Sequence, residues 1–117
     1  MKELASIDAL DALISGSGEA PVILFKHSTT CPLSARAAMR VEDYLDEPVE
    51  NGPEILMVKV IQSRPVSNAI TDKLRVEHQS QQMILVRDGK AVWNASHSAI
   101  TAAAITDAVK ANLAAAK

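Results

Sequence analysis

Cysteine and aromatic residues are scarce in this sequence. Of its 117 residues one is a cysteine, Cys31, and Phe, Tyr and Trp occur once each. A single cysteine excludes an intramolecular disulfide, which fits a reducing compartment. Hydrophobic residues still make up 48% of the chain, so the core is expected to be aliphatic rather than aromatic. The length leaves no room for a linker between two cores, and we expect a single domain over residues 1–117.

An excess of charge of either sign is also missing. Lys and Arg number 12, Asp and Glu number 14, and the two signs are interspersed. The chain therefore has no basic stripe of the kind that neutralises phosphates, and we expect no nucleic-acid partner. Its apolar runs fall short of the roughly 18 residues that cross a membrane, and Met1-Lys2-Glu3 leads into an amphipathic segment instead of a signal sequence. We expect a cytoplasmic monomer that does not bind membranes.

Apolar periodicity predicts helices and strands in alternation. A turn signal, Asp88-Gly89, separates the last two apolar runs and is typical of a β-hairpin. The first two strands are joined through a helix, which predicts a right-handed parallel βαβ unit. The predicted helices cover residues 6–15, 32–46, 65–74 and from about 98 onward, and the predicted strands cover 22–26, 55–61, 83–86 and 91–95.

The resulting element order is α-β-α-β-α-β-β-α. This order resembles the thioredoxin-like fold, an α/β fold with a mixed four-stranded sheet flanked by helices on both faces. The resemblance implies that the first predicted strand lies in the centre of the sheet, beside the second and the third. Its apolar run Val22–Phe25 fits that place, because a central strand covered by helices is buried on both faces.

Cys31 lies between the end of this predicted central strand and the start of the predicted helix. Pro32 follows it and suits the first helical position, where no backbone N–H is needed. A thiol at a helix N-terminus faces unpaired backbone N–H groups and the positive end of the helix dipole, which favour the thiolate. A lone cysteine is more often a small buried hydrophobe, so its position is what predicts a nucleophile.

The stretch Cys31-Pro32-Leu33-Ser34 lies where a thioredoxin carries Cys-x-x-Cys. Ser34 stands at the second cysteine position, so the chain has no resolving thiol there. A monothiol reaction remains: the Cys31 thiolate attacks a mixed disulfide, takes up the small thiol, and is released by a second small thiol. We expect Thr30 and Ser34 to donate hydrogen bonds to the sulfur.

Three stretches resemble the monothiol bacilliredoxins, a thioredoxin-like family with a Thr-Cys-Pro-x-Ser site. They are Phe25–Ser34, Val60–Asn68, and Trp93 with Ser96-His97. The likeness to the family runs in order over nearly the whole chain. The resemblance implies a cytoplasmic thiol-disulfide oxidoreductase with glutaredoxin-type chemistry, which removes bacillithiol from S-bacillithiolated proteins. Bacillithiol is then a co-substrate, and no cofactor is bound permanently. The three histidines form no metal-ligand spacing with Cys31, so we expect no metal.

One residue departs from the family pattern. Thioredoxin-like proteins, this family included, place a cis-proline before the third strand, facing the nucleophile, and here Gln81 stands at that position. A cis bond before a residue other than proline costs about 3–4 kcal/mol. The Ser80–Gln81 bond is therefore either cis and strained, or trans with a shifted loop. The resemblance implies that the Ser80 backbone binds the substrate disulfide, and a shifted loop weakens that contact.

Other polar residues near Cys31 are candidates for substrate binding, each with a plain alternative. Lys26 and Arg64 either attract the carboxylates of bacillithiol or are solvated surface charges. His27 either orients the thiolate or a substrate carboxylate, or is a hydrogen-bonded residue at a strand end. Ser67 and Asn68 either bind polar groups of the ligand or cap a helix.

Two other functions use the same cysteine. A monothiol site of this fold can bridge an iron–sulfur cluster between two subunits, with small thiols as further ligands. The chain can also be a redox-sensing module that is modified at Cys31 and turns over no substrate. The Thr-Cys-Pro pattern differs from that of cluster-carrying monothiol glutaredoxins, so the enzyme is the main prediction.

Overall fold

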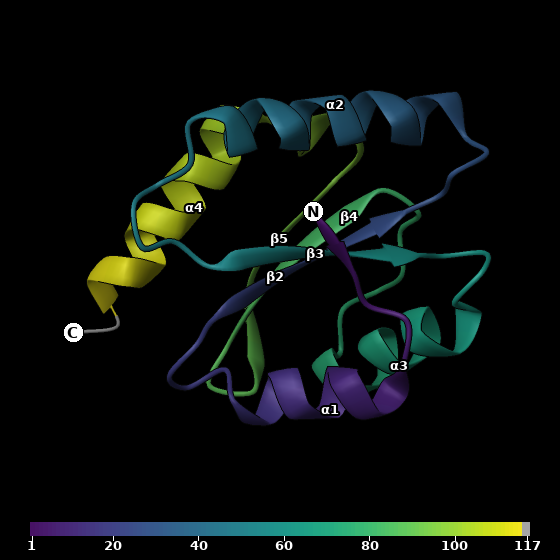
Figure 1. Ribbon diagram of the computed structural model, residues 1–117, viewed down its shortest axis with the longest axis horizontal. Helices are drawn as coiled ribbons and strands as arrows, with labels where there is room; N and C mark the ends of the chain where they lie inside the picture. The colour runs from purple at the N-terminus through teal and green to yellow at the C-terminus, as the bar shows by residue number, and fades with distance from the viewer. Residues whose placement is uncertain (116–117) are drawn as a thin grey trace.

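The computed structural model describes residues 1–115 and places one mixed sheet between two pairs of helices (Figure 1). The strand order is β1-β3-β2-β4-β5. The elements are β1 (Lys2–Glu3), α1 (Ile7–Ser15), β2 (Val22–His27), α2 (Pro32–Asp46), β3 (Glu54–Lys59), α3 (Arg64–Leu74), β4 (Gln82–Arg87), β5 (Lys90–Ser96), the 3₁₀ helix η1 (His97–Ala99) and α4 (Ala102–Ala115).

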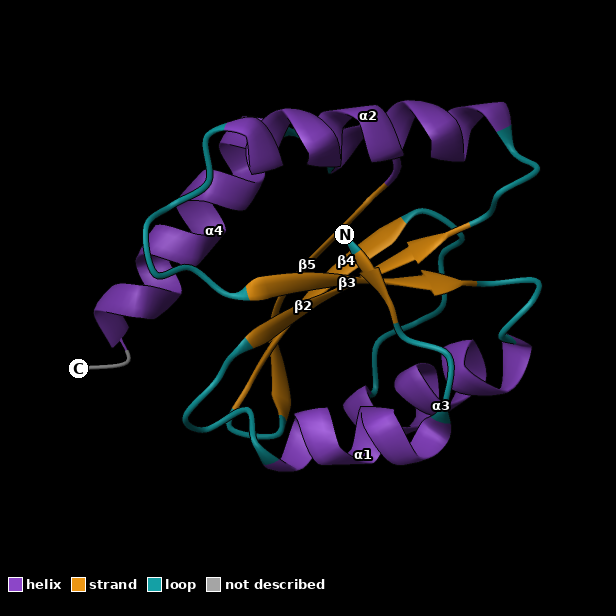
Figure 2. Cartoon of the chain, in the orientation of Figure 1, coloured by secondary structure: helices purple, strands orange, loops and turns teal. Residues whose placement is uncertain are grey.

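Strand β2 is the centre of the sheet, as the thioredoxin-like resemblance implied. It pairs in parallel with β3 and antiparallel with β4, so that Ile23 lies between Ile55 and Leu85. Figure 2 shows α1 and α3 on one face of the sheet and α2 and α4 on the other. Leu24 packs in the core cluster of the first pair, whereas Ile23 packs in that of the second. Both faces of β2 are therefore buried, which explains its continuous apolar run.

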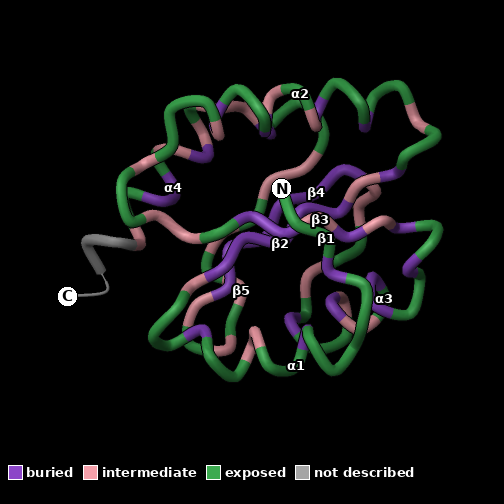
Figure 3. Tube along the Cα trace, in the orientation of Figure 1, coloured by how far each residue is buried: buried purple, intermediate pink, exposed green. Residues whose placement is uncertain are grey.

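Burial follows the same division along the whole chain. In Figure 3 the buried positions follow the strands and the inward sides of the helices. Tyr44 of α2 and Ile105 of α4 are in the cluster on one face, and Ile70 of α3 is in the cluster on the other. The α/β class with helices on both faces is thus confirmed. Within residues 1–115, no helix has the length and apolarity to cross a membrane.

The prediction of four strands is wrong by one. Strand β1 is two residues long and pairs in parallel with β3 at the sheet edge, with Lys2 opposite Leu56. Two residues are too few to show an alternating pattern, so periodicity could not predict this strand. Ion pairs of Lys2 with Glu54 (3.6 Å) and of Glu3 with Lys59 (3.4 Å) lie along this edge.

The last helix begins later than predicted. Residues His97–Ala99 form a 3₁₀ turn, and α4 starts at Ala102. The Oγ1 of Thr101 accepts a hydrogen bond from the backbone N–H of Ala104 at 3.1 Å, as an N-cap does. The cap therefore lies at Thr101 rather than near Ser98. The end of the predicted helix, residues 116–117, lies outside the described residues.

Candidate functional site

Cys31 is the N-cap residue of α2, directly after the loop that leaves β2. Its backbone is extended (φ −102°, ψ 121°), its carbonyl accepts from the N–H of Ala35 at 3.0 Å, and Pro32 opens the helix. The Cys31 side chain is half-buried. The predicted place of the thiol at a helix N-terminus is therefore confirmed. The first backbone N–H groups of α2 and its dipole favour an anion there.

Gln81 is the residue that donates a hydrogen bond to the sulfur. Its Nε2 lies 3.7 Å from Cys31 Sγ, and its Oε1 lies 3.1 Å from Nδ1 of His97. The backbone N–H of His97 also donates to the carbonyl oxygen of Gln81 at 3.0 Å. Gln81 is only 4% exposed. Its carboxamide is thus held between the thiol and an imidazole, with the donor end toward the sulfur.

The peptide bond before Gln81 is trans, as are all peptide bonds in residues 1–115. Of the two predicted alternatives, the strained cis bond is therefore wrong. Before proline the cis form is only slightly less stable than the trans form, whereas before other residues it is much less stable. Ser80 is half-buried directly before this bond, and β4 begins at Gln82, directly after it.

Ser34 holds the loop before Cys31. It is fully buried, and its Oγ accepts from the backbone N–H of Ser28 at 2.9 Å and lies 2.8 Å from Nδ1 of His27. In the part of the chain that is described, the hydrogen bond to the sulfur comes from Gln81, and not from Thr30 or Ser34 as predicted. The reason is that the Ser34 oxygen faces the end of β2.

His27 is a hydrogen-bonded residue at the end of β2, the second of its two predicted alternatives. Besides its contact with Ser34, its ring stacks on Phe25 with the centroids 5.6 Å apart. Burial lowers the pKa of His27, the hydrogen bond with Ser34 acts in the opposite direction, and the charge of Lys59 lowers it further. His27 therefore lies beside the thiol loop as a neutral imidazole near neutral pH.

Lys26 is buried, and the alternative of a solvated surface charge is wrong. Its side chain is 0% exposed and packs on the α3 side of the sheet. The Nζ donates to Oγ1 of Thr71 at 3.0 Å and lies 3.1 Å from Nδ1 of His78. Burial lowers the pKa of Lys26 from 10.5 to about 8. The pKa of His78 is also lowered, by partial burial and by the charges of Lys26 and Arg64.

The remaining candidates lie on α3. Ser63 is the N-cap of this helix, so the capping alternative for Ser67 and Asn68 is wrong. Arg64 and Asn68 are exposed, whereas Ser67 is fully buried. The Oγ of Ser67 has no hydrogen-bond partner among the described residues. Their role in ligand binding stays a prediction.

A pocket with a volume of about 380 Å³ opens beside Gln81. Its two arginines were not among the predicted site residues, although their spacing of four on the helix after Cys31 was readable. No sequence pattern could bring them to Gln81, because that contact depends on how η1 follows the β-hairpin. The pocket is lined by Leu33, Arg36, Arg40, Gln81, His97 and Ser98.

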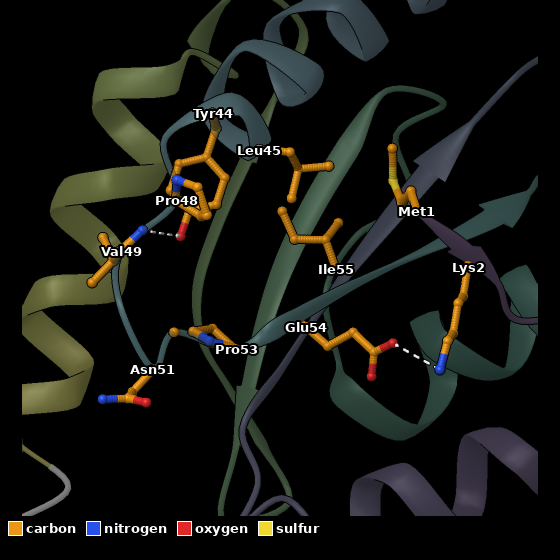
Figure 4. Close-up of a pocket in the computed structure, with 11 residues that line it drawn as sticks. Met1, Lys2, Tyr44, Leu45, Pro48, Val49, Asn51, Pro53, Glu54 and Ile55 are labelled. Carbon is orange, nitrogen blue, oxygen red and sulfur yellow. Dashed lines mark hydrogen bonds and ion pairs between the residues drawn. The ribbon is translucent and has the colours of Figure 1, made fainter.

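A second pocket, of about 370 Å³, lies at the other end of the sheet (Figure 4). Glu54 and Ile55 at the start of β3 line it, whereas Cys31 follows the end of the parallel strand β2. Figure 4 shows Tyr44 accepting a hydrogen bond from the N–H of Val49 at 3.3 Å. Its lining contains neither cysteine nor histidine, whereas the pocket beside Gln81 shares that residue with the hydrogen bond to the Cys31 sulfur.

Among the described residues, no group of three or more His, Cys, Asp or Glu is placed to hold a metal ion. The chemistry available at the corner is that of a thiol at a helix N-terminus with a carboxamide donor beside it.

The fold and this corner define a redox protein of the thioredoxin class. A solved structure provisionally described as an oxidoreductase with a thioredoxin fold is 32% identical, with 92% of this chain and 91% of that chain covered and a TM-score of 0.78. The thioredoxin of Fasciola hepatica is 21% identical over the full length of both chains, with a TM-score of 0.66. A structure named Trxlp from Edwardsiella tarda is also 21% identical, covering 93% and 98%, with a TM-score of 0.67. The last two show the fold alone.

The family is defined by sequence. The family model of monothiol bacilliredoxin BrxC matches residues 2–105. This chain belongs to the monothiol bacilliredoxin family, and the predicted family is confirmed. The single cysteine fits the word monothiol. The protein is therefore a thioredoxin-fold redox enzyme.

Proposed function

We propose that this enzyme removes bacillithiol from protein mixed disulfides by monothiol exchange at Cys31. The observation that carries the proposal is the place of the only cysteine, at the N-cap of α2 with Gln81 donating to its sulfur. Ser34 at the resolving position is buried in hydrogen bonds of its own, which leaves the second step to an external thiol. Membership of the monothiol bacilliredoxin family supports bacillithiol as that thiol.

The exchange proceeds through two balanced steps. The Cys31 thiolate attacks the bacillithiol sulfur of the mixed disulfide, a bond between Cys31 and bacillithiol forms, and the protein thiolate leaves and takes a proton from water. A second bacillithiol thiolate then attacks the bacillithiol sulfur on Cys31. This step forms bacillithiol disulfide and returns the Cys31 thiolate. Each turnover thus consumes the mixed disulfide and one free bacillithiol thiol and yields the client thiol and bacillithiol disulfide, and no cofactor is needed.

The residues around the thiol have separable roles in this proposal. Gln81 stabilises the thiolate, both as nucleophile and as leaving group in the second step. Pro32 fixes the start of α2, and Ser34 holds the preceding loop through Ser28. Thr30 is exposed beside Cys31, and we propose it as a contact to the client instead of a donor to the sulfur. We expect a monomeric, single-domain protein acting in the cytoplasm.

Mass spectrometry of the adduct tests the proposal most directly. Incubation with a bacillithiolated protein should move one bacillithiol onto Cys31 and free the client thiol, and excess bacillithiol should then give steady-state turnover. The Cys31→Ala variant is the control and should transfer nothing. Equal loss of the client adduct with the alanine variant would refute the proposal. Adduct formation without turnover would instead identify a redox-sensing module.

A further inference from the structure

The pocket beside Gln81 carries two arginines and no acidic residue among its lining side chains. Arg36 and Arg40 are four residues apart on α2, so they lie on one face of the helix. Neither forms an ion pair with the described part of the chain. In a protein with a net charge of −2, this pocket is a local positive region with no carboxylate of its own.

Arg40 is fixed at the wall of the pocket by the backbone of the segment before α4. Its Nη2 donates to the carbonyl oxygen of His97 at 3.1 Å, and its Nε donates to the carbonyl oxygen of Ile100. These bonds orient the guanidinium plane in advance and leave its other N–H groups for a ligand. Arg36 is exposed, and within residues 1–115 no hydrogen bond occupies its guanidinium.

The pocket opens directly beside the reacting atom. Gln81 lines it and at the same time donates to Cys31 Sγ at 3.7 Å. His97 lines it as well and has a left-handed backbone, with φ 55°. Hydrogen bonds on both sides of that residue, to the carbonyl of Gln81 and from Arg40, hold this conformation. A molecule joined to Cys31 through a disulfide therefore has this positive pocket within reach.

We propose that this pocket binds the carboxylates of the small thiol that exchanges with Cys31, with Arg36 as the main anion contact and Arg40 as a fixed second one. The guanidinium group pairs with carboxylates through two parallel hydrogen bonds. A volume of about 380 Å³ suits a small molecule rather than a folded segment of a client. The inference rests on the proposed function and adds to it the side chains that bind the carboxylates of the exchanging thiol.

This assignment differs from the prediction that Lys26 and Arg64 attract the substrate carboxylates. Lys26 has no exposed surface, and its Nζ is engaged by Thr71 and His78. Arg64 is exposed at the start of α3, whereas Gln81 and the pocket with Arg36 lie on the α2 side of the thiol. The two arginines, Arg36 and Arg64, can therefore be tested against each other.

A single-turnover reaction with two disulfides gives the first test. The rate at which Cys31 forms an adduct is measured by mass spectrometry with bacillithiol disulfide, which is anionic, and with 2-hydroxyethyl disulfide, which is neutral. The Arg36→Gln variant should react about tenfold more slowly with the anionic disulfide, because a charge-assisted pair is lost, and at an unchanged rate with the neutral one. Arg75→Gln, the same change at the exposed C-cap of α3, should alter neither rate.

Three results would overturn the pocket assignment. In the first, Arg36→Gln slows adduct formation equally with both disulfides. In the second, it slows adduct formation with neither. In the third, Arg64→Gln slows the reaction with the anionic disulfide more selectively than Arg36→Gln does. Each can occur while Cys31 still accepts bacillithiol, so the proposed function would stand. If the second result is accompanied by a slower reaction with the bacillithiolated client, Arg36 acts on an acidic client instead of the small thiol.

A binding measurement tests the pocket without the chemistry. The Cys31→Ser variant is titrated with L-malate, a dicarboxylate without sulfur, and amide shifts are followed by NMR. Saturable shifts should centre on Arg36, Arg40 and His97 and should be lost in a Cys31→Ser, Arg36→Gln double variant. Shifts centred on residues 64–68, or shifts that do not saturate, contradict the inference. If malate binds as expected but Cys31 accepts no thiol, the proposed function fails and the pocket stands.

Discussion

The two sides of the thiol use similar residue types in opposite ways. On the α2 side, Arg36 faces an open pocket and Gln81 reaches the sulfur. On the α3 side, Lys26 is fully buried, and its Nζ donates to Thr71 and lies 3.1 Å from Nδ1 of His78. Both groups lie near the same end of β2. The difference shows that closeness to the thiol in sequence does not make a cation available to a ligand.

The geometry of β2 explains the difference. Neighbouring residues of a strand point to opposite faces, so Phe25 packs under α2 and α4 whereas Lys26 enters the layer of α1 and α3. The arginines, in contrast, lie on an exposed helix side, and η1 leaves the pocket open there. We therefore expect changes on the α3 side to act on stability and changes on the α2 side to act on the thiol.

Lys26→Met should give the largest change in how stability depends on pH. Because burial lowers the pKa of Lys26 from 10.5 to about 8, the unfolded chain binds more protons than the folded one between these values. The wild-type free energy of unfolding should therefore rise with pH across that window, and below about pH 8 the full penalty of the buried charge is present. The rise relative to the Met variant is at most about 3 kcal/mol.

Chemical denaturation at pH 7.5, 9 and 10.5 measures this difference, since a tenfold change in proton affinity between the folded and unfolded chains corresponds to about 1.4 kcal/mol. All variants carry Cys31→Ser, so that the thiol does not titrate. Lys110→Met, at an exposed position of α4, serves as the control. Its free energy of unfolding should depend on pH in the same way as that of the parent protein. If Lys26→Met also runs parallel to it, then Lys26 is not a buried charge and the contrast between the two sides collapses.

The parts of this architecture that could be predicted are those encoded locally. The apolar run of β2 and the proline after Cys31 placed the thiol at a helix N-terminus, and Asp88-Gly89 adopts positive φ angles of 53° and 75° in the predicted hairpin. The hydrogen bond from Gln81 to Cys31 joins residues 50 positions apart. No local pattern encodes such a contact, since it depends on the register of β2 with β4.

The burial of Lys26 was hidden for a different reason. Lysine side chains are usually exposed, also at the end of an apolar strand. The burial of Lys26 is tolerated because its Nζ has Thr71 and His78 as partners. Those partners come from α3 and from the loop after it. The candidate site was thus predictable as a position, but not as a set of contacts.

Two buried serines, one on the α2 side and one on the α3 side, allow a second comparison with a smaller expected effect on stability. Ser34 on α2 and Ser67 on α3 are both 0% exposed, but Ser34 has hydrogen bonds with Ser28 and His27, whereas Ser67 Oγ has no partner in the described residues. Ser34→Ala should lower the free energy of unfolding by about 2 kcal/mol, because the buried N–H of Ser28 loses its acceptor. Ser67→Ala should be neutral or slightly stabilising.

Urea denaturation of the two variants at pH 7 measures both effects in one series. Since each change removes the same oxygen from a buried helical position, the difference between them reports the hydrogen bonds rather than the loss of volume. Equal destabilisation of the two variants would mean that Ser67 has a partner of its own, and the α3 side would then be a polar network rather than a sealed layer.

Gln81→Met should give the smallest effect and the most specific one. It keeps the length of the side chain but removes the donor to Cys31 Sγ. The lost hydrogen bond, worth about 1 kcal/mol, no longer stabilises the thiolate in which Cys31 reacts. A thiolate without that hydrogen bond is more nucleophilic. On a logarithmic scale, this offsets roughly half of the decrease in the alkylation rate. Alkylation by iodoacetamide at pH 7 should therefore slow about twofold.

The effect of Gln81→Met on the alkylation rate should change sign at high pH. Where both proteins react entirely as the thiolate, only the difference in nucleophilicity remains, so Gln81→Met should react faster than wild type at high pH. Gln62→Met makes the same change at an exposed amide that donates to Thr29 instead of the sulfur, and its alkylation profile should match wild type. A uniform slowing by Gln81→Met at all pH values would indicate reduced access rather than a lost donor. The hydrogen bond to the sulfur would then have no part in the chemistry of the α2 side.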